Sequence, residues 1–289
     1  INKRAYVDTH AVKKLLEWAG EFREVAAEAP TDVAEEVCTW EACRKAINKF
    51  KKGSGVGVDG FDGYLVKQAP ECVQRRYHAV LQEMVRLHTF PPEWNEWIGM
   101  LAMKPGEDPR DLSRRRDLWL QCHSSKCLVR MLLKEYDRVA AETVPASQAG
   151  WTAARNGPEQ ALVARLAAEQ SMLEQTPLYK GFCDYGTMFM SVVHQTQWEV
   201  EKWTGVSPEV TDVMRALREG IKGTELKPLM GRYETALGLT SKVNIEKGLG
   251  QGDLASPARA KLTLTVVQRA VNRLCSGYKF IGAKRHTPL

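Results

Sequence analysis

The chain has 289 residues, of which 44% are hydrophobic and 26% charged, and its formal net charge is +6. This composition is typical of a globular protein with a substantial core, and the excess of basic residues favours a polyanionic partner. No apolar run approaches the roughly 18 residues of a membrane span, and no charged leader is present, so we expect an intracellular protein, nuclear or cytoplasmic.

The sequence of residues 1–50 predicts a helical extension at the N-terminal end. Apolar side chains at helical spacing predict an amphipathic helix over residues 8–29. We expect a short extended piece over 33–37, followed by a second helix that Thr39 caps and that ends near residue 50. Lysines and glycines over 49–60 predict a surface loop, because glycine adopts backbone angles that other residues avoid.

The next part of the chain combines helices with a hairpin. Helical periodicity predicts helices over residues 71–88 and 124–141, and a third that begins after Asn156, a capping side chain. Between the first two, residues 97–103 and 118–120 predict two strands of a hairpin with basic residues at its exposed end.

The sequence of the C-terminal part predicts a further sheet. Residues 179–184 are expected to form a buried strand that delivers Asp184 at its C-terminal end. A helix over 207–219, a hairpin over 229–245 and a helix over 254–274 follow. Helices packed against small antiparallel sheets predict a helix-rich α+β fold.

Several motifs occur along the chain in a definite order. Residues 53–60 read GSGVGVDG, and residues 91–94 read PPEW, ahead of Lys-Pro-Gly at 104–106. Further on, residues 182–185 read FCDY, and residues 250–257 read GQGDLASP at the head of an apolar helix.

In order and spacing these motifs resemble those of reverse transcriptases of the non-long-terminal-repeat retrotransposon type, from about Ile47 onward, with group II intron enzymes as more distant relatives. The resemblance implies a right-hand polymerase with an N-terminal extension over 1–50, fingers over 51–176 and a partial palm over 177–289. It further implies an RNA-directed DNA polymerase whose ligands are an RNA template, a DNA primer, a deoxynucleoside triphosphate and Mg²⁺.

The resemblance also assigns site residues. Asp184 matches the first metal-binding, catalytic aspartate of the palm, and Phe189 matches the residue that screens the sugar 2′ position. Gln251 and Gly252 match the helix-capping turn under the nucleotide, while Lys104 and Arg116 match the cations that clamp the triphosphate.

Each assignment has a structural alternative. Asp184 could be a strand-end acid that a turn satisfies, and Phe189 an ordinary core residue. The turn could be a simple helix N-terminus with Asp253 or Ser256 as its cap, and the run of arginines before Asp117 a solvated charge cluster.

Basic side chains are candidates for contact with template phosphates, which would give salt-dependent affinity with little sequence preference. The alternative for each is an exposed solubilising charge. The candidates are Lys49, Lys51, Lys52, Lys126 and Arg130.

Three departures from the family pattern bear on activity. Met190 replaces an aspartate, residues 115–118 replace Tyr-Arg-Pro-Ile, and no Asp-Asp dipeptide occurs in the chain. Nucleotidyl transfer needs two divalent ions roughly 4 Å apart, and Asp184 alone supplies too little negative charge for both. We therefore expect the chain alone not to polymerise. The alternatives are a degenerate fold kept as a nucleic-acid-binding or interaction module, and a fragment of an active enzyme whose palm continues beyond Leu289.

The seven cysteines are scattered without paired metal-ligand spacing. Structural thiols in a reducing compartment explain them better than a metal site built on Cys122, His123 and Cys127. The other histidines are isolated in sequence and predict surface or satisfied, partly buried imidazoles.

Overall fold

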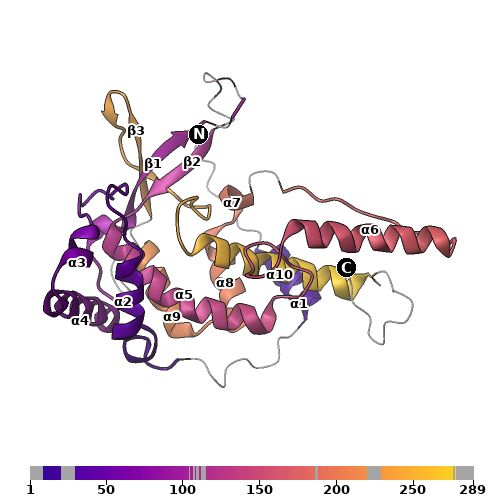
Figure 1. Ribbon diagram of the computed structural model, residues 1–289, viewed down its shortest axis with the longest axis horizontal. Helices are drawn as coiled ribbons and strands as arrows, with labels where there is room; N and C mark the ends of the chain where they lie inside the picture. The colour runs from indigo at the N-terminus through magenta and orange to yellow at the C-terminus, as the bar shows by residue number, and fades with distance from the viewer. Residues whose placement is uncertain are drawn as a thin grey trace.

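Helices make up most of the described chain, and a small sheet projects from one edge of the helical body (Figure 1). The computed structural model describes residues 9–20, 30–103, 105–106, 108, 111, 115–185, 188–219, 229–275 and 277. The α+β class predicted from sequence is confirmed. Over these residues, no helix has the length and apolar character needed to cross a membrane.

The N-terminal elements pack against later parts of the chain. They are α1 (Thr9–Ala19), the π-helix η2 (Val33–Val37), α2 (Trp40–Asn48), α3 (Tyr64–Gln68) and α4 (Glu71–Leu87). The predicted cap of α2 is confirmed, because Thr39 Oγ1 accepts a hydrogen bond from the Ala42 N–H at 3.2 Å. α1 packs on α10, and α2 packs on α5.

The extended piece predicted over residues 33–37 is wrong. Asp32 accepts a hydrogen bond from the Glu35 N–H at 3.0 Å, and the Glu36 carboxylate accepts from the Thr31 and Asp32 N–H groups. These side chains satisfy the backbone donors of a helical turn, which buries Val33 and Val37 against the core.

A five-stranded sheet combines segments from both halves of the chain. It comprises β1 (Glu96–Ala102), β2 (Arg116–Leu120), β3 (Met230–Thr235), β4 (Gly238–Leu239) and β5 (Val243–Asn244). The hairpin of β1 and β2 is confirmed as antiparallel. β3 pairs with β1 in parallel, however, so the sheet is mixed and the prediction of purely antiparallel sheets is wrong.

This parallel pairing follows from a small aromatic cluster on the sheet. Trp97 and Trp119 are buried together with Leu229, and Tyr233 and Ile245 pack against them. The Trp119 and Tyr233 rings lie 5.2 Å apart. Burial of these large rings stabilises the pairing of β1 with β3 across a wide separation in sequence.

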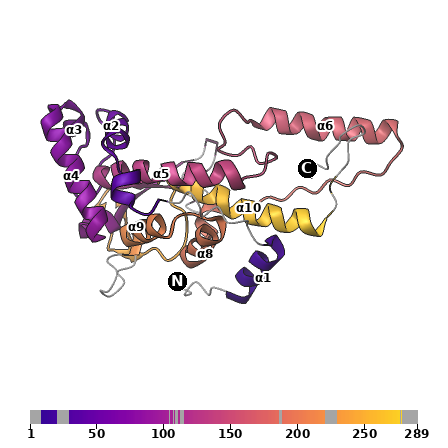
Figure 2. The same cartoon turned by 90° about the horizontal axis from the view of Figure 1, so that it is seen from below.

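The remaining helices form the body around α10. They are the 3-10 turn η3 (Pro92–Asn95), α5 (His123–Thr143), α6 (Gly157–Leu173), α7 (Met188–Ser191), α8 (His194–Thr204), α9 (Pro208–Glu219) and α10 (Ser256–Leu274). α10 contacts α1, α5 and α8, as the view from below shows (Figure 2). The predictions for α5, α6, α9 and α10 are confirmed.

The strand predicted over residues 179–184 is wrong. Residues 174–185 belong to no strand and run back beside α6 (Figure 1), where Lys180 Nζ donates to the Ala164 carbonyl oxygen at 2.8 Å. Tyr179 and Phe182 are 91% and 94% exposed. The local sequence is suited to a strand, but none of the described strands pairs with it.

Candidate nucleotide and nucleic-acid site

The glycine-rich turn at residues 250–252 lies directly against β2. The Gln251 carbonyl oxygen accepts a hydrogen bond from the Trp119 N–H at 2.7 Å. Gly252 has φ +104°, and a Cβ placed there would lie 2.7 Å from the Trp119 carbonyl oxygen. Glycine is therefore required at position 252 both for its backbone angle and for this close approach.

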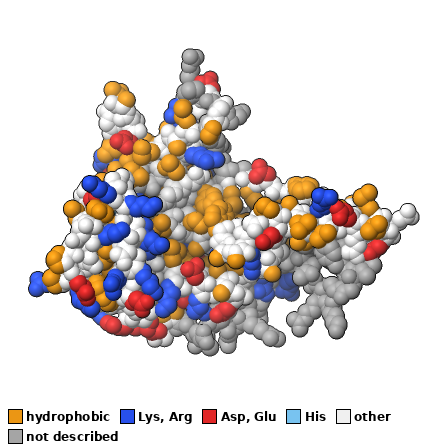
Figure 3. Space-filling view, viewed as in Figure 1, with side chains coloured by type: hydrophobic (Ala, Val, Ile, Leu, Met, Phe, Trp, Pro, Cys, Tyr) orange, Lys and Arg blue, Asp and Glu red, His pale blue; other side chains and the backbone are white. Residues whose placement is uncertain are grey.

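The two residues that lead into this turn are bonded to α7 and to the residue that follows it. The Leu249 N–H donates to the Phe189 carbonyl oxygen at 2.5 Å, and the Gly248 N–H donates to the Val192 carbonyl oxygen at 2.7 Å. The Phe189 ring meets the Trp151 ring edge to face at 5.2 Å. Hydrophobic side chains form a patch beside α7 on this face (Figure 3).

These backbone hydrogen bonds bring together residues that are far apart in sequence. Gln251 and Gly252 lie in the turn, Phe189 lies in the bonded helix α7, and Arg116 begins the bonded strand β2. Arg116 and Gly252 are exposed, while Gln251 and Phe189 are partly buried. Four of the predicted nucleotide-binding residues therefore lie on three joined segments.

Asp253 acts in the fold rather than at the surface. Its Oδ2 accepts from Ser256 Oγ at 3.0 Å and pairs with Arg218, and its Oδ1 accepts from the Ala255 N–H at 3.3 Å. Burial disfavours its charged form, but Arg218 and Arg259 outweigh burial and hold the pKa of Asp253 below its ordinary value. Neither Asp253 nor Ser256 is the N-cap of α10, because that position is Ala255 and no side chain makes a capping hydrogen bond there.

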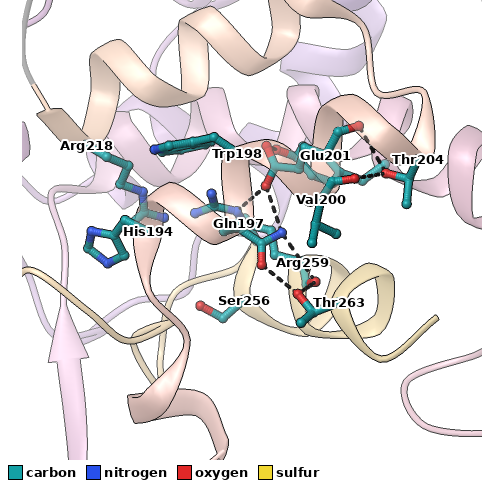
Figure 4. A network of polar contacts seen from close by, with 12 residues as sticks. His194, Gln197, Trp198, Val200, Glu201, Thr204, Arg218, Ser256, Arg259 and Thr263 are labelled. Carbon is teal, nitrogen blue, oxygen red and sulfur yellow. Dashed lines mark hydrogen bonds and ion pairs between the residues drawn. The ribbon is translucent and has the colours of Figure 1, made fainter. Parts of the chain in front are cut away.

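A buried polar network joins α8 and α10 (Figure 4) and reaches α5 through Tyr136. Glu201 Oε1 accepts from Arg259 Nε at 2.5 Å and from Gln197 Nε2 at 3.0 Å, and Glu201 Oε2 accepts from Tyr136 Oη at 3.0 Å. The Arg259 and Glu201 side chains are 3% and 0% exposed. Arg259 also lies over the Trp198 ring at 4.2 Å.

His194 links this network to the turn. Its Nε2 lies 2.9 Å from the Gly248 carbonyl oxygen, so a neutral ring donates a hydrogen bond from this nitrogen. Burial, with the positive charges of Arg259 and Arg218, lowers the pKa of His194 to about 4. The ring is therefore neutral at pH 7.

The hydrogen bonds that join these segments do not include Asp184. Asp184 lies exposed on the segment before α7, and Lys104 lies outside the described residues. The turn at residues 105–106, next to Lys104, is present between β1 and β2.

The predicted nucleic-acid-binding residues fall into three settings. Lys51 and Arg130 line one groove of about 800 Å³ between α2 and α5, and Lys49 lines it as well. Lys52 is exposed and does not line this groove. Lys126 is partly buried, and burial followed by repulsion from Arg130 lowers its pKa.

The cysteine and histidine side chains at the start of α5 do not converge. His123 Nδ1 accepts from the Gly63 N–H at 2.9 Å, and His123 Nε2 lies 3.0 Å from the Gly55 carbonyl oxygen. Cys122 Sγ donates to the Glu93 carbonyl oxygen at 3.4 Å, and burial raises the pKa of Cys122 to about 12. Both ring nitrogens of His123 are thus hydrogen-bonded to backbone groups. The seven cysteines are free thiols.

Sequence reasoning did not identify the buried charges. One signal was present: Arg259 shares the helical spacing of the buried residues Ala255, Leu262 and Val266. A charged side chain on the apolar face of a helix indicates a buried ion pair. No comparable signal marks α8, whose buried face carries Gln197, Glu201 and Thr204.

Comparison with known proteins leaves the family open. No model of a protein family matches this chain, and no curated protein matches it. Function must therefore be argued from the site itself.

Substitution of the turn glycine tests the geometry beneath the site. Gly252→Ala adds a Cβ that cannot coexist with the Trp119 carbonyl oxygen, so we expect the free energy of unfolding to fall by about 2–3 kcal/mol. Gly238→Ala is the matched control, because Gly238 has φ +107° but nothing within 4 Å of the added Cβ. Urea denaturation should show a smaller loss for Gly238→Ala, and equal losses would contradict a specific contact.

His194 predicts a dependence of stability on pH. Its pKa falls from 6.5 in the unfolded chain to about 4 in the folded protein. The unfolded state therefore binds the additional proton between these values, and acidification from pH 7 to pH 5 should remove about 2 kcal/mol of stability through this group. Urea denaturation of the wild type and His194→Gln, whose amide can still donate, should show a shallower pH dependence for the variant. Parallel curves for the two proteins would refute the assignment.

Proposed function

We propose that this chain is a reverse-transcriptase-like domain of a retroelement that binds a deoxynucleoside triphosphate and an RNA–DNA hybrid against the turn at residues 250–252. The observation that carries the proposal is the joining of this turn to β2 and α7 by backbone hydrogen bonds. These bonds join the segments that carry Arg116, Phe189, Gln251 and Gly252, which sequence motifs had singled out separately.

The chemistry of these residues suits a nucleotide. The exposed Arg116 guanidinium can hold phosphate oxygens in a bidentate fork. Phe189 supplies an apolar surface for a sugar, and the exposed backbone of Gly252 can face a base or sugar. An RNA template and a DNA primer would add phosphate contacts to basic side chains nearby.

The residues present do not fit a two-magnesium centre. Asp184 is a single exposed carboxylate, the chain has no Asp-Asp pair, and no three His, Cys, Asp or Glu side chains of the described residues gather as metal ligands. Magnesium requires oxygen ligands in near-octahedral array, most of them charged or water. We therefore propose binding without polymerisation by this chain.

A second candidate is an interaction module that retains the fold without nucleotide chemistry. It is favoured by the exposed position of Asp184 and by the structural use of Asp253 in an ion pair with Arg218. The two candidates differ in whether the turn and β2 contact nucleic acid.

Binding of an RNA–DNA hybrid tests the proposal. We expect Arg116→Ala to weaken binding and to lower the slope of log affinity against log salt by about 1, because one phosphate contact is lost. Arg165→Ala is the control, since the Arg165 side chain is 77% exposed on α6 and pairs with Glu169 on the same helix. Fluorescence anisotropy at several salt concentrations measures both slopes. Absence of hybrid binding, or equal effects of the two variants, would favour the interaction module.

The role of Asp184 is tested separately. We expect no template-dependent primer extension by the chain with Mg²⁺ and deoxynucleotides, and we expect Asp184→Ala to leave hybrid affinity within about twofold of wild type. The physical reason is that one exposed carboxylate neither assembles two ions nor contacts phosphate favourably. Robust extension that Asp184→Ala abolishes would overturn this view.

A further inference from the structure

The lining of a groove between α2 and α5 includes none of the predicted nucleotide-binding residues of the turn, α7 and β2. Its volume is about 800 Å³, and Leu254, just beyond the glycine turn, contributes to its lining. Figure 1 shows the two helices side by side, and α2 packs on α5. The groove is thus a trough between two helices of one rigid core.

The floor of the groove is aliphatic. Ala42 and Ala46 come from α2, and Met131 and Leu133 come from α5. Ala46 and Met131 are buried, with 3% and 1% of their surface exposed, so the accessible apolar surface comes mainly from Ala42, Leu133 and Leu254. None of the residues that line the groove is aromatic.

The rim of the groove is mainly cationic. Lysine and arginine side chains gather over this part of the surface (Figure 3). Two acids, Glu41 and Asp137, interrupt the rim, and Glu41 pairs with Lys45 at 2.7 Å. The five cations of the lining are Lys45, Lys49, Lys51, Arg130 and Lys134.

This combination discriminates between two kinds of polyanion. A single nucleic-acid strand gains much of its affinity by stacking bases on aromatic side chains, which this lining lacks. The carboxylates of Glu41 and Asp137 would also repel a continuous row of phosphates. An amphipathic helix instead buries aliphatic side chains on an aliphatic floor and places acids against the lysines.

We propose that the groove between α2 and α5 is a docking site for an acidic amphipathic helix of a protein partner. The partner helix would insert apolar residues at i, i+3 or i+4, and i+7 over Ala42, Leu133 and Leu254, the partly buried apolar residues of the lining. α2 has nine residues, so it spans about 14 Å, which matches about two and a half turns of a partner helix. The charge complementarity of its rim sets the orientation of that helix and speeds its encounter.

The experiment uses the whole chain and a labelled peptide of about 14 residues that forms a helix with leucines on one face and glutamates on the other. Two probes accompany it: a peptide of the same composition without a continuous apolar face, and a single-stranded oligonucleotide of similar charge. Fluorescence anisotropy should show binding of the amphipathic peptide and at least about tenfold weaker binding of the other two.

Adjacent lysines provide the matched variants. Lys51 lines the groove and Lys52 does not, although both are exposed. Lys51→Glu should weaken the binding of the amphipathic peptide about tenfold, whereas Lys52→Glu should weaken it less than about twofold. Ala42→Glu, which adds bulk and charge to the floor, should abolish binding, and circular dichroism checks that each variant is folded.

Three results would overturn the proposal. The first is that the amphipathic peptide does not bind. The second is that Lys51→Glu and Lys52→Glu change its affinity equally. The third is that the oligonucleotide binds more tightly than the peptide and that Lys51→Glu weakens the binding of the oligonucleotide. The last result would assign the groove to nucleic acid. None of them bears on hybrid binding through Arg116, so the two proposals fail independently.

Discussion

Two buried ion pairs set the position of the glycine turn. Arg259 pairs with Glu201, Arg218 pairs with Asp253, and all four side chains are at most 7% exposed. A buried charge without its partner is strongly destabilising, whereas apolar contacts tolerate small shifts. The pairs therefore fix α8, α9 and the start of α10 relative to one another more stringently than packing alone.

The backbone groups of the turn stabilise the fold, and the groups that are not used in this way form part of the proposed site. The Gln251 carbonyl oxygen and the Leu249 N–H are used in hydrogen bonds to β2 and α7, and Asp253 is used in an ion pair. In the proposed site, the Gln251 side chain and the exposed Arg116 side chain are available to a ligand. Such a division gives a preorganised surface, because rigid elements hold each contacting group.

Local patterns in the sequence predict most helices and the first hairpin, because burial on one face and caps such as Thr39 act over a few residues. They fail where distant groups decide the outcome. The parallel pairing of β1 with β3 depends on the aromatic cluster of Trp97 and Trp119, which no local pattern contains. α8 escaped prediction because its buried face is polar, and its partners Arg259 and Tyr136 lie on other helices. The site residues were found as separate motifs, but their joining by backbone hydrogen bonds could not be read from spacing.

Asp184 matches a motif in the sequence, but its structural setting does not hold the carboxylate in place for a function. Its segment has the composition of a strand, yet it is exposed and belongs to no strand among the described residues. A metal ligand must be held within about 0.5 Å of its productive position by rigid neighbours. The turn, β2 and α7 meet that condition through their hydrogen bonds, and the segment of Asp184 does not. In the proposed function, ligand binding therefore depends on the residues of the turn, β2 and α7, and a catalytic role for Asp184 would require a strand that pairs with its segment.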